Sequence, residues 1–427
     1  MIKKIMLLGL MASCVRSEAP AQAMEFHVQA QQHAKINLLL ALVGEAPSPE
    51  LIACAQVVKK DMEFSGTFNI TVKNMQSVST ANELKALNTQ GYPLVLFMNE
   101  NKRGTAIEWR MYDTTSTEMI KGKNYHKRGD TPRGWAHQLA DAVWPELTAQ
   151  EGFFCTKIAY CKQVKGKNRP LNNIYIADFN NDDPHHFIAG STLAPRFSAD
   201  VCNPMLFYSD NTRSNVCLKT ASMDKVIKKA SNFNGFNMCP TFCDDAVAYC
   251  ASHGSGSCHI YVYKDKKLSR LTSNTGNNIS PSFAHDGSFL YFCSDYKEGR
   301  PHIYKLDMKS GAEQAITSGA ESSFCPSYCS KKKQLAYTKM MQGVAQIFLY
   351  DETTGKHKQL TFDRTTKDEC CWSPCGNYLM YSVQKSGQGR IAILSLLTGQ
   401  EQLITGANEN CSYPTWSPRY EQYPVIA

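Results

Sequence analysis

One short segment of the chain brings together a serine and a histidine, the residue types that many hydrolases use as nucleophile and base. It reads His253-Gly254-Ser255-Gly256-Ser257. The nucleophile turn of α/β-hydrolases has the order Gly-x-Ser-x-Gly, and this segment has a different order in a loop between expected strands. His-Glu-x-x-His, a phosphate-binding loop and a dinucleotide fingerprint are also absent from the sequence. The residues therefore favour a binding protein over an enzyme, and we expect no catalytic residues.

Two other patterns contain residue types that bind metals. His185-His186 follows Asn181-Asp182-Asp183-Pro184, a cluster typical of a solvated turn. Asp-Gly turns such as Asp286-Gly287 supply one or two oxygen ligands each, whereas calcium takes six to eight. Their ordinary role is to close a hairpin. We therefore expect neither a metal site nor a bound cofactor.

The chain has 17 cysteines, and a four-residue spacing recurs at Cys239-x-x-x-Cys243, Cys325-x-x-x-Cys329 and Cys371-x-x-x-Cys375. Zinc sites usually have the tighter Cys-x-x-Cys spacing or histidine partners. Four extended residues span about 13 Å, which is too far for a disulfide within each pair. Two interpretations remain open: disulfides across strands, for example between Cys250 and Cys258, or buried and inert thiols.

A longer pattern indicates the architecture. A three-residue phrase that ends in an aromatic residue occurs six times, and five of the six copies begin with proline. It reads Pro195-Arg196-Phe197, Pro240-Thr241-Phe242, Pro281-Ser282-Phe283, Pro326-Ser327-Tyr328, Cys370-Cys371-Trp372 and Pro414-Thr415-Trp416. The steps between first positions are 45, 41, 45, 44 and 44 residues. A period near this length, with several short strands in each repeat, indicates a β-propeller in which each repeat is a four-stranded blade.

The phrase is expected to form the innermost strand of each blade. Residues 149–427 then give six blades, of which the first lacks its own phrase before Ile158-Ala159-Tyr160. The phrase at Pro414 is left over at the C-terminal end and can supply the missing strand. We therefore expect the C-terminal strand to close the ring and remove its exposed edges.

Residues 24–148 have a different character and predict an α/β domain with the order βαβαβββα. Ser48 and Thr131 each precede a proline, as residues that cap helices do. Trp135, Leu139 and Val143 recur at helical spacing and indicate the inner face of the last helix. The expected fold is one mixed sheet covered by helices. The strands are expected at Lys35–Gly44, Thr67–Val72, Tyr92–Met98, Thr105–Tyr112 and Glu118–Lys127, and the helices from Pro49, Thr80–Leu87 and from Pro132.

The first 23 residues resemble a cleaved export signal. Lys3 and Lys4 precede the apolar run Ile5–Ala12, and Ala21-Gln22-Ala23 is a small-residue cleavage site. Lipidation at Cys14, after Ala12-Ser13, is the minor alternative. No later run has the length of a transmembrane helix. The net charge is +8, and the longest basic run is Lys331-Lys332-Lys333, so we expect an exported protein that binds no nucleic acid.

Several of these segments resemble the TolB family of propeller proteins. They are Ser280-Pro281-Ser282-Phe283-Ala284-His285-Asp286-Gly287, Tyr413-Pro414-Thr415-Trp416-Ser417-Pro418, Ser294-Asp295 with Gly299-Arg300-Pro301-His302-Ile303-Tyr304-Lys305, and the linker Gly152-Phe153-Phe154. The resemblance covers essentially the whole mature chain, since it includes the N-terminal domain as well as the blades. The chain departs from the family at Cys370, where proline is expected, at several altered Asp-Gly turns and in its many cysteines.

The resemblance implies a monomeric, non-enzymatic adaptor of the Tol–Pal envelope system in the periplasm, which supports outer-membrane integrity and envelope constriction during division. Its implied partners are the lipoprotein Pal, the inner-membrane protein TolA and other outer-membrane proteins. Pal is expected at one mouth of the central channel, on Phe236, Asn237, Met238, Cys239, Asn277, Asn278, Ile279, Ser280 and Asp295, with Glu321, Ser322, Lys367, Asp368 and Glu369 on the rim.

TolA is expected to bind the mature N-terminal segment near residues 24–34, in which Glu25, Phe26, His27 and Val28 form a candidate switch. Two other classes remain as alternatives. One is an exported propeller that binds carbohydrate or peptidoglycan, as lectins do, and the other is a propeller hydrolase.

Overall fold

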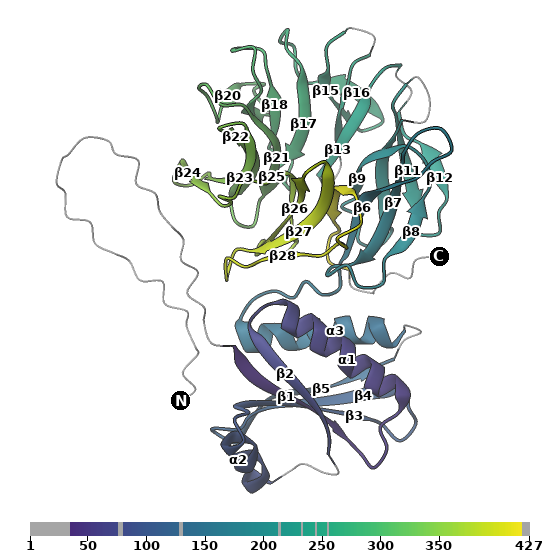
Figure 1. The fold of residues 1–427 in the computed structure, drawn as a ribbon, viewed down its shortest axis with the longest axis vertical. Helices are drawn as coiled ribbons and strands as arrows, with labels where there is room; N and C mark the ends of the chain where they lie inside the picture. Colours follow the sequence, from purple (N-terminus) through teal and green to yellow (C-terminus); the bar gives the residue numbers. More distant parts are fainter. Residues whose placement is uncertain are drawn as a thin grey trace, which may run out of the picture.

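The computed structural model describes residues 35–75, 80–127, 131–211, 215–231, 234–243, 246–253 and 256–420. An α/β unit lies at one side of a β-propeller (Figure 1). The expected signal peptide, Cys14 and the switch segment of Glu25, Phe26, His27 and Val28 lie outside the described residues.

The α/β unit contains a five-stranded mixed sheet with the order β2-β1-β3-β4-β5. Its strands are β1 (Ile36–Val43), β2 (Phe68–Met75), β3 (Leu94–Glu100), β4 (Ala106–Asp113) and β5 (Glu118–His126). β1 pairs in parallel with β2 and β3, while β3, β4 and β5 form antiparallel hairpins. Leu38 to Leu42 on the interior strand β1 are all buried, as expected of a strand covered on both faces.

Three helices follow the expected order and confirm the βαβαβββα pattern. They are α1 (Pro49–Phe64), α2 (Ala81–Thr89) and α3 (Pro132–Thr148). Each begins at a hydroxyl cap: Ser48 accepts a hydrogen bond from the Leu51 amide, and Thr80 forms a reciprocal capping box with Glu83. Thr131 caps α3 in the same way.

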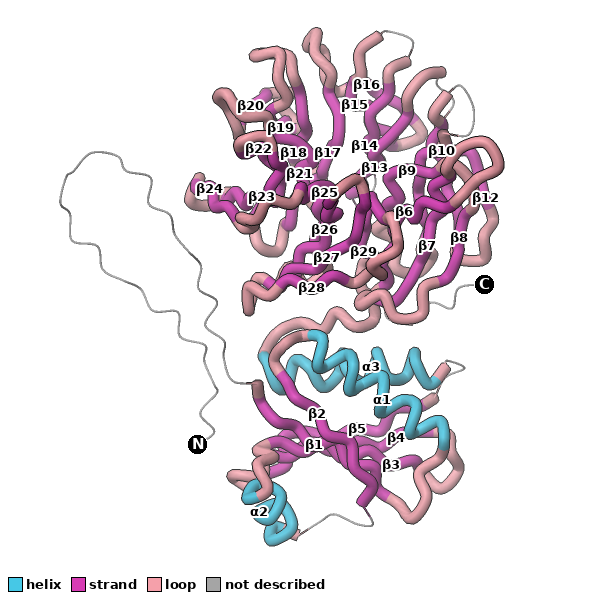
Figure 2. Tube along the Cα trace, viewed as in Figure 1, coloured by secondary structure: helices cyan, strands magenta, loops and turns pink. Residues whose placement is uncertain are grey.

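The helices cover opposite faces of the sheet. α1 and α3 lie side by side between the sheet and the propeller, and α2 packs on the far face (Figure 2). The core under α1 and α3 continues into the propeller through Trp144, Phe153, Phe154 and Tyr378. Phe153 stacks on Phe154 with ring centroids 4.5 Å apart and lies 4.6 Å from Tyr378. One apolar core therefore joins the two units.

The propeller has six four-stranded antiparallel blades, as the repeat predicted, with the aromatic phrase on the innermost strand of each. Blade 1 contains β29 (Cys411–Trp416), β6 (Lys157–Val164), β7 (Leu171–Asp178) and β8 (His185–Ile188). Blade 2 contains β9 (Thr192–Phe197), β10 (Met205–Asp210), β11 (Cys217–Ser222) and β12 (Ile227–Lys229). Blade 3 contains β13 (Asn237–Cys243), β14 (Ala246–Ala251), β15 (His259–Lys264) and β16 (Lys267–Arg270).

The remaining blades have the same order from the inside outward. Blade 4 contains β17 (Asn278–Phe283), β18 (Phe289–Ser294), β19 (His302–Asp307) and β20 (Glu313–Ala315). Blade 5 contains β21 (Ser323–Cys329), β22 (Gln334–Met341), β23 (Val344–Asp351) and β24 (Lys356–Gln359). Blade 6 contains β25 (Thr366–Trp372), β26 (Tyr378–Lys385), β27 (Gln388–Ser395) and β28 (Glu401–Leu403).

The ring is closed by the C-terminal strand, as expected. β29 pairs antiparallel with β6, with Cys411 opposite Lys162 and Trp416 opposite Ile158. The buried indole of Trp416 donates a hydrogen bond to the Thr156 hydroxyl at 2.8 Å. Residues at the two ends of the propeller sequence thus form a single blade.

The sixteen cysteines in the described part of the chain are all free thiols, and eleven of them are buried. The cross-strand disulfide considered between Cys250 and Cys258 is not formed. Of the two interpretations of the cysteine pattern, buried thiols describe most positions.

We expect a chain that ends at Asn410 to lose the folded propeller rather than a single strand. Blade 1 would lack its inner strand, and the ring would have two open edges. Thermal melting followed by circular dichroism should show no cooperative propeller transition. Trp416→Ala in the full chain should lower the free energy of unfolding by about 3–5 kcal/mol.

The matched control ends at Tyr420 and keeps β29 with all its described contacts. It should melt like the full chain. An unchanged melting curve for the chain that ends at Asn410 would contradict the closure.

Candidate partner-binding face of the propeller

The two ends of the propeller differ in what covers them. Turns between first and second strands, and between third and fourth strands, lie at the end that meets the α/β unit. There Asn377 donates a hydrogen bond to Gln150 at 3.0 Å, and Lys60 on α1 reaches Asp182 in the β7–β8 turn at 3.0 Å. The opposite end is formed by the loops that enter the inner strands and by the turns between second and third strands.

We name this opposite end the mouth face and define it by residues 234–236, 271–277, 316–322 and 360–365, together with the turn 295–301. Hydrogen bonds connect its two kinds of loop. The Phe236 amide donates to the Ser252 hydroxyl at 3.0 Å, and Asn277 donates from its amide and its side chain to Asp295 at 2.7 and 3.1 Å. The α/β unit contacts the propeller at the other end, so its described residues do not cover the mouth face.

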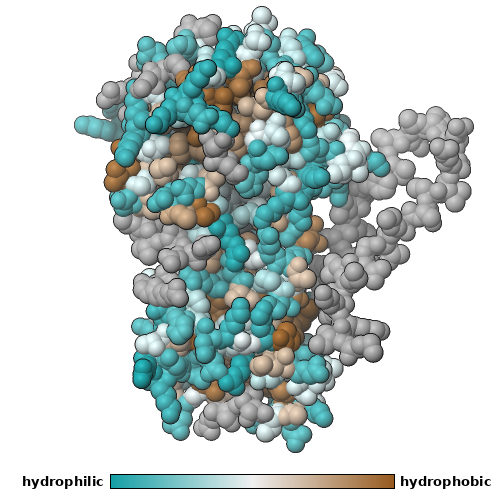
Figure 3. All heavy atoms as spheres, turned by 180° about the vertical axis from the view of Figure 1, so that it is seen from behind, coloured by the Kyte–Doolittle hydropathy of each residue, from teal (hydrophilic) through white to brown (hydrophobic). Residues whose placement is uncertain are grey.

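Two phenylalanines give this face its apolar surface. Phe236 is 57 % exposed and Phe362 is 60 % exposed, and both lie in loops that enter inner strands. The rear surface of the molecule is mainly hydrophilic, with apolar residues in small separate groups (Figure 3). An exposed aromatic ring is the type of residue that anchors a protein partner. Sequence reasoning missed Phe362, although its position before a phrase could have identified it.

The asparagines among the expected contact residues have different roles. Asn277 is exposed, whereas Asn237 and Asn278 are fully buried. Asn278 donates from its side chain to Asn274 at 2.8 Å and to the Gly276 carbonyl at 2.9 Å, and Asn237 donates to the Val216 carbonyl at 2.9 Å. The two buried asparagines therefore brace the loops that present Phe236 and Asn277.

Gly276 allows the closest of these approaches. A Cβ atom at this position would lie 2.6 Å from the Asp295 carboxylate and 2.6 Å from the Tyr296 amide nitrogen. No side chain fits in that space, so the loop 271–277 can approach the turn 295–301 only because residue 276 is glycine.

The other residues expected to contact the partner differ in their exposure to solvent. Glu321 is exposed, Ser322 is half-buried, and Met238 and Ile279 pack partly buried against the core of blades 3 and 4. Lys367 is only 1 % exposed, and its ammonium group contacts Asp363 and the Thr365 hydroxyl. The structure therefore places Glu321 on the surface and turns Lys367 inward.

Cys239, Ser280, Asp368 and Glu369 lie below the rim and line a cavity of about 530 Å³ in the central channel. Cys239, Ser280 and Glu369 have φ angles of 53°, 52° and 58°. Each occupies the position just before a phrase, where the pairing with the second strand shifts by a bulge. The corresponding residues of the other blades are Ala194, Cys325 and Tyr413, with φ angles of 46°, 51° and 53°.

We call these six residues the channel ring; its members are Ala194, Cys239, Ser280, Cys325, Glu369 and Tyr413. Burial, with the adjacent Asp368 carboxylate, raises the pKa of Glu369 to about 7. Hydrogen bonds from the Ser382 hydroxyl and the Tyr413 amide, both at 2.6 Å, oppose this rise. The channel therefore gains negative charge as the pH rises through neutrality.

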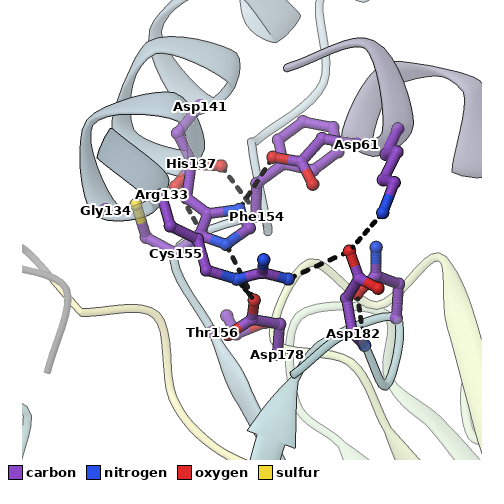
Figure 4. Close-up of polar contacts among 12 residues, drawn as sticks. Asp61, Arg133, Gly134, His137, Asp141, Phe154, Cys155, Thr156, Asp178 and Asp182 are labelled. Atoms are coloured by element: carbon purple, nitrogen blue, oxygen red, sulfur yellow. Dashed lines mark hydrogen bonds and ion pairs between the residues drawn. The ribbon is translucent and has the colours of Figure 1, made fainter. Parts of the chain in front are cut away.

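A second group of ionisable residues lies between the two units, around His137 on α3 (Figure 4). Its Nδ1 is 2.7 Å from Asp61 on α1, and its Nε2 is 3.2 Å from Asp178 at the end of β7. Arg133 and Lys157 also contact Asp178. His137, Asp61 and Asp178 are buried, so this group fixes the orientation of the units and offers no access to a substrate.

The neighbouring charges set the protonation of this group. The flanking carboxylates raise the pKa of His137 to about 9 against the opposing effect of burial. Burial raises the pKa of Asp61 to about 6, and the cations around Asp178 hold its pKa well below the usual value. At neutral pH a protonated imidazole therefore lies between two carboxylates.

Asp141 on α3 holds the linker between the units. Its carboxylate accepts hydrogen bonds from the amides of Phe154 and Cys155 at 2.8 and 3.2 Å, and Arg419 reaches it at 2.7 Å. A Cβ atom on Gly152 would lie 2.9 Å from the Asp141 Cα atom, which leaves no space for a side chain there. The start and the end of the propeller sequence are thus fixed to one helix.

No cluster of three or more His, Cys, Asp or Glu side chains in the described ranges is arranged to hold a metal ion. None of the helices described here has the length and apolar composition to cross a membrane.

The fold and the open end define a six-bladed propeller with an N-terminal α/β unit, built to present loops at one face. Residues 144–420 match the family model of the TolB β-propeller domain, which is well over half of the chain. The chain belongs to this family, as the resemblance of its repeats indicated.

Curated relatives and solved structures agree with this assignment. The Tol-Pal system protein TolB of Francisella tularensis subsp. mediasiatica (strain FSC147) is 24% identical over 378 residues, which cover 84% of this chain and 85% of the relative. The protein of the same name from F. tularensis subsp. tularensis (strain FSC 198) is also 24% identical, over 84% of each chain.

The crystal structure of TolB from Acinetobacter baumannii has a TM-score of 0.77 at 19% identity and covers 90% of this chain and 97% of its own. The crystal structure of a nidogen/laminin complex matches with a TM-score of 0.50 at 11% identity, over 62% of this chain and 99% of that chain. Both matches are similarities of fold, and the match with TolB from Acinetobacter baumannii covers the larger share of this chain.

We expect the stability of the protein to fall as the pH rises through about 9, because His137 then loses its proton between two buried carboxylates. The pKa of His137 is higher in the folded state than in the unfolded state. Its contribution to the free energy of unfolding is therefore complete below the unfolded-state pKa near 6.5 and is lost as the pH rises through the folded-state pKa of about 9. His137→Gln should lower the free energy of unfolding at neutral pH by about 3–5 kcal/mol.

The measurement is the difference in melting temperature between wild type and His137→Gln at each pH from about 7 to 10. Taking the difference removes the effect of lysines and tyrosines that titrate in the same range. The difference should shrink toward alkaline pH. A constant difference would contradict the assigned role of His137.

Proposed function

We propose that this protein is a non-enzymatic periplasmic adaptor of the Tol–Pal system, and that its mouth face binds the lipoprotein Pal. The observation that carries the proposal is the exposed Phe236 of blade 3, which lies on the same mouth face as the Asn277–Asp295 pair of blade 4, at the end of the channel away from the α/β unit. Family membership and the Tol-Pal names of the curated relatives support the choice of partner.

The mouth face has the composition of a binding surface. Phe236 before blade 3 and Phe362 before blade 6 supply apolar area, and Asn277, Asp295 and Glu321 on the blades between them supply hydrogen-bonding groups. Aromatic anchors combined with polar groups are typical of protein–protein interfaces. The buried asparagines beneath hold the loops in one conformation, which reduces the entropy lost when a partner binds.

The titratable groups support a binding role rather than catalysis. His137 has the most strongly raised histidine pKa, but it is fully buried between two packed units. His253 belongs to the segment first considered as a possible nucleophile site, and its ring packs edge-on against Tyr261. A catalytic group must reach its substrate, which the buried His137 cannot do.

Phe236→Ala should weaken the binding of the purified periplasmic domain of Pal by about tenfold or more, because it removes the exposed anchor. Asn277→Ala should weaken binding less, since Asp295 would keep its place through the backbone of residue 277. Isothermal titration calorimetry with the folded variants measures both effects.

The matched control is Tyr263→Ala, which removes another exposed aromatic residue of blade 3, near the β15–β16 turn at the other end. It should bind Pal like the wild type. An equal loss of affinity for Pal in both variants would contradict a contact at the mouth face. If the wild type does not bind Pal, Pal is not the partner.

We further propose that residues 24–34 bind TolA and that the two partner sites are coupled. A chain that starts at Lys35 should keep its affinity for Pal and lose its affinity for TolA. In the mature chain, saturating Pal should change the affinity for TolA, as reciprocal linkage requires. Equal affinities for TolA with and without Pal, measured by calorimetry, would contradict the proposed coupling.

A further inference from the structure

We infer that Cys239 and Cys250 form an oxidisable dithiol inside the channel, which a disulfide oxidant converts to an intrablade disulfide. This site goes beyond the proposed adaptor function and does not depend on it. It rests on the repeated geometry of the six blades and on the departure of blade 3 from that geometry.

Each blade contains two equivalent positions at the channel. The first is the channel-ring residue, and the second lies on the neighbouring strand, opposite the residue that precedes the ring residue. In blades 1 to 6 these pairs are Tyr413 and Cys161, Ala194 and Ser209, Cys239 and Cys250, Ser280 and Cys293, Cys325 and Thr338, and Glu369 and Ser382. Among these six pairs, blade 3 has cysteine at both positions.

Blade 6 shows that side chains at the two positions can touch. The Ser382 hydroxyl donates a hydrogen bond to the Glu369 carboxylate at 2.6 Å. The positive φ of the ring residue and the adjacent bulge bring its side chain toward the second strand. The same backbone geometry in blade 3 brings Cys239 toward Cys250.

Cys250 is oriented differently from its equivalents. In blades 1, 2 and 4 the second-strand group donates to a carbonyl of the next blade: Cys161 to Thr192 at 3.4 Å, Ser209 to Asn237 at 3.2 Å, and Cys293 to Ser323 at 3.6 Å. These hydrogen bonds turn the side chains away from the channel ring.

In blade 3 the Cys250 thiol instead donates to the Met238 carbonyl of its own blade at 3.2 Å. Met238 directly precedes Cys239, so the Cys250 sulfur points toward the ring residue of its own blade and not toward the next blade. The hydrogen bond between the two thiols, which lowers the pKa of Cys239, agrees with this orientation. A sulfur–sulfur bond needs such adjacency, which the extended spacing of Cys239 and Cys243 along one strand does not supply.

The two thiols are also chemically unlike each other. The hydrogen bond from Cys250 lowers the pKa of Cys239 to about 7, and the Arg196 guanidinium lowers it further, while burial opposes both. The pKa of Cys250 is raised well above its usual value. Cys239 thus supplies the thiolate that attacks, and Cys250 supplies the second thiol.

The conversion is a thiol–disulfide exchange with a disulfide-bearing oxidant, such as oxidised glutathione or a protein disulfide. The Cys239 thiolate attacks one sulfur of the oxidant, which releases a thiolate and leaves a mixed disulfide. Cys250 then loses its proton and attacks the Cys239 sulfur, which releases the second thiolate. The dithiol loses two electrons and two protons, and the oxidant is reduced to two thiols.

Cys325 provides an internal comparison. It occupies the same ring position with a φ of 51°, and it also lines the channel cavity. Thr338 lies at its second-strand position and donates to Asp368 at 2.9 Å. Burial raises the pKa of Cys325 well above the usual value. The ring position alone therefore does not make a reactive cysteine.

The test exposes the purified, reduced full chain to glutathione buffers of graded oxidised-to-reduced ratio. Free thiols are then trapped with iodoacetamide, and the peptides are mapped by mass spectrometry. We expect one internal link, Cys239–Cys250, which dithiothreitol reverses. A link between Cys250 and Cys258, a link between Cys239 and Cys325, or no internal link at any ratio would overturn the inference.

Variants separate the redox role from folding. Cys250→Ser should leave Cys239 trapped as a glutathione mixed disulfide and shift its alkylation by iodoacetamide to higher pH. Cys325→Ser is the matched control and should keep the Cys239–Cys250 link. Thr338→Cys should gain a second link, to Cys325, because it recreates the blade 3 pair in blade 5. Absence of that link in a folded variant would contradict the geometric argument.

Discussion

The pairing of β29 with β6 is the constraint on which the rest of the molecule depends. A propeller blade has two apolar faces and must pack against a neighbour on each side, so an open ring leaves two of them in water. Ile158 lies near the start of the propeller sequence and Trp416 near its end, and the two residues face each other in this pair. The pairing therefore joins the two ends of the propeller sequence within one blade. The α/β unit is held at the same junction, since Asp141 binds both the linker and Arg419.

This junction also explains why the two ends of the propeller can differ in function. The buried group around His137 and the aromatic core at Phe153 fix one end to the α/β unit. The residues of that end therefore have a structural role, whereas the loops of the mouth face do not contribute to these contacts. A partner at the mouth face would meet loops braced by Asn237 and Asn278. The buried side chain of Asn278 bonds to the Gly276 carbonyl of its own loop, and that of Asn237 bonds to the Val216 carbonyl of the neighbouring blade, so both lie out of the partner's reach.

The sequence predicted the architecture well because the features that define it are local or periodic. The phrase at Pro281 and its five equivalents identify inner strands without any knowledge of contacts, and the cap at Ser48 identifies a helix start. The site was harder, because side-chain direction depends on the bulge in each inner strand. Lys367 was expected at the rim and points inward. The His137 group joins residues 61, 137 and 178, which no local pattern connects.

The channel ring shows how one backbone can carry divergent chemistry. Six residues have nearly the same positive φ, although they are alanine, serine, tyrosine, glutamate and two cysteines. The left-handed conformation is unfavourable for such residues, so the surrounding strands must impose it. The phrase and its bulge therefore fix where the side chain points, and the residue type is free to vary. Glu369 and Cys239 differ chemically, yet each occupies the same position relative to a second-strand residue, Ser382 or Cys250, so the chemistry available in the channel depends on pairs of positions rather than on single residues.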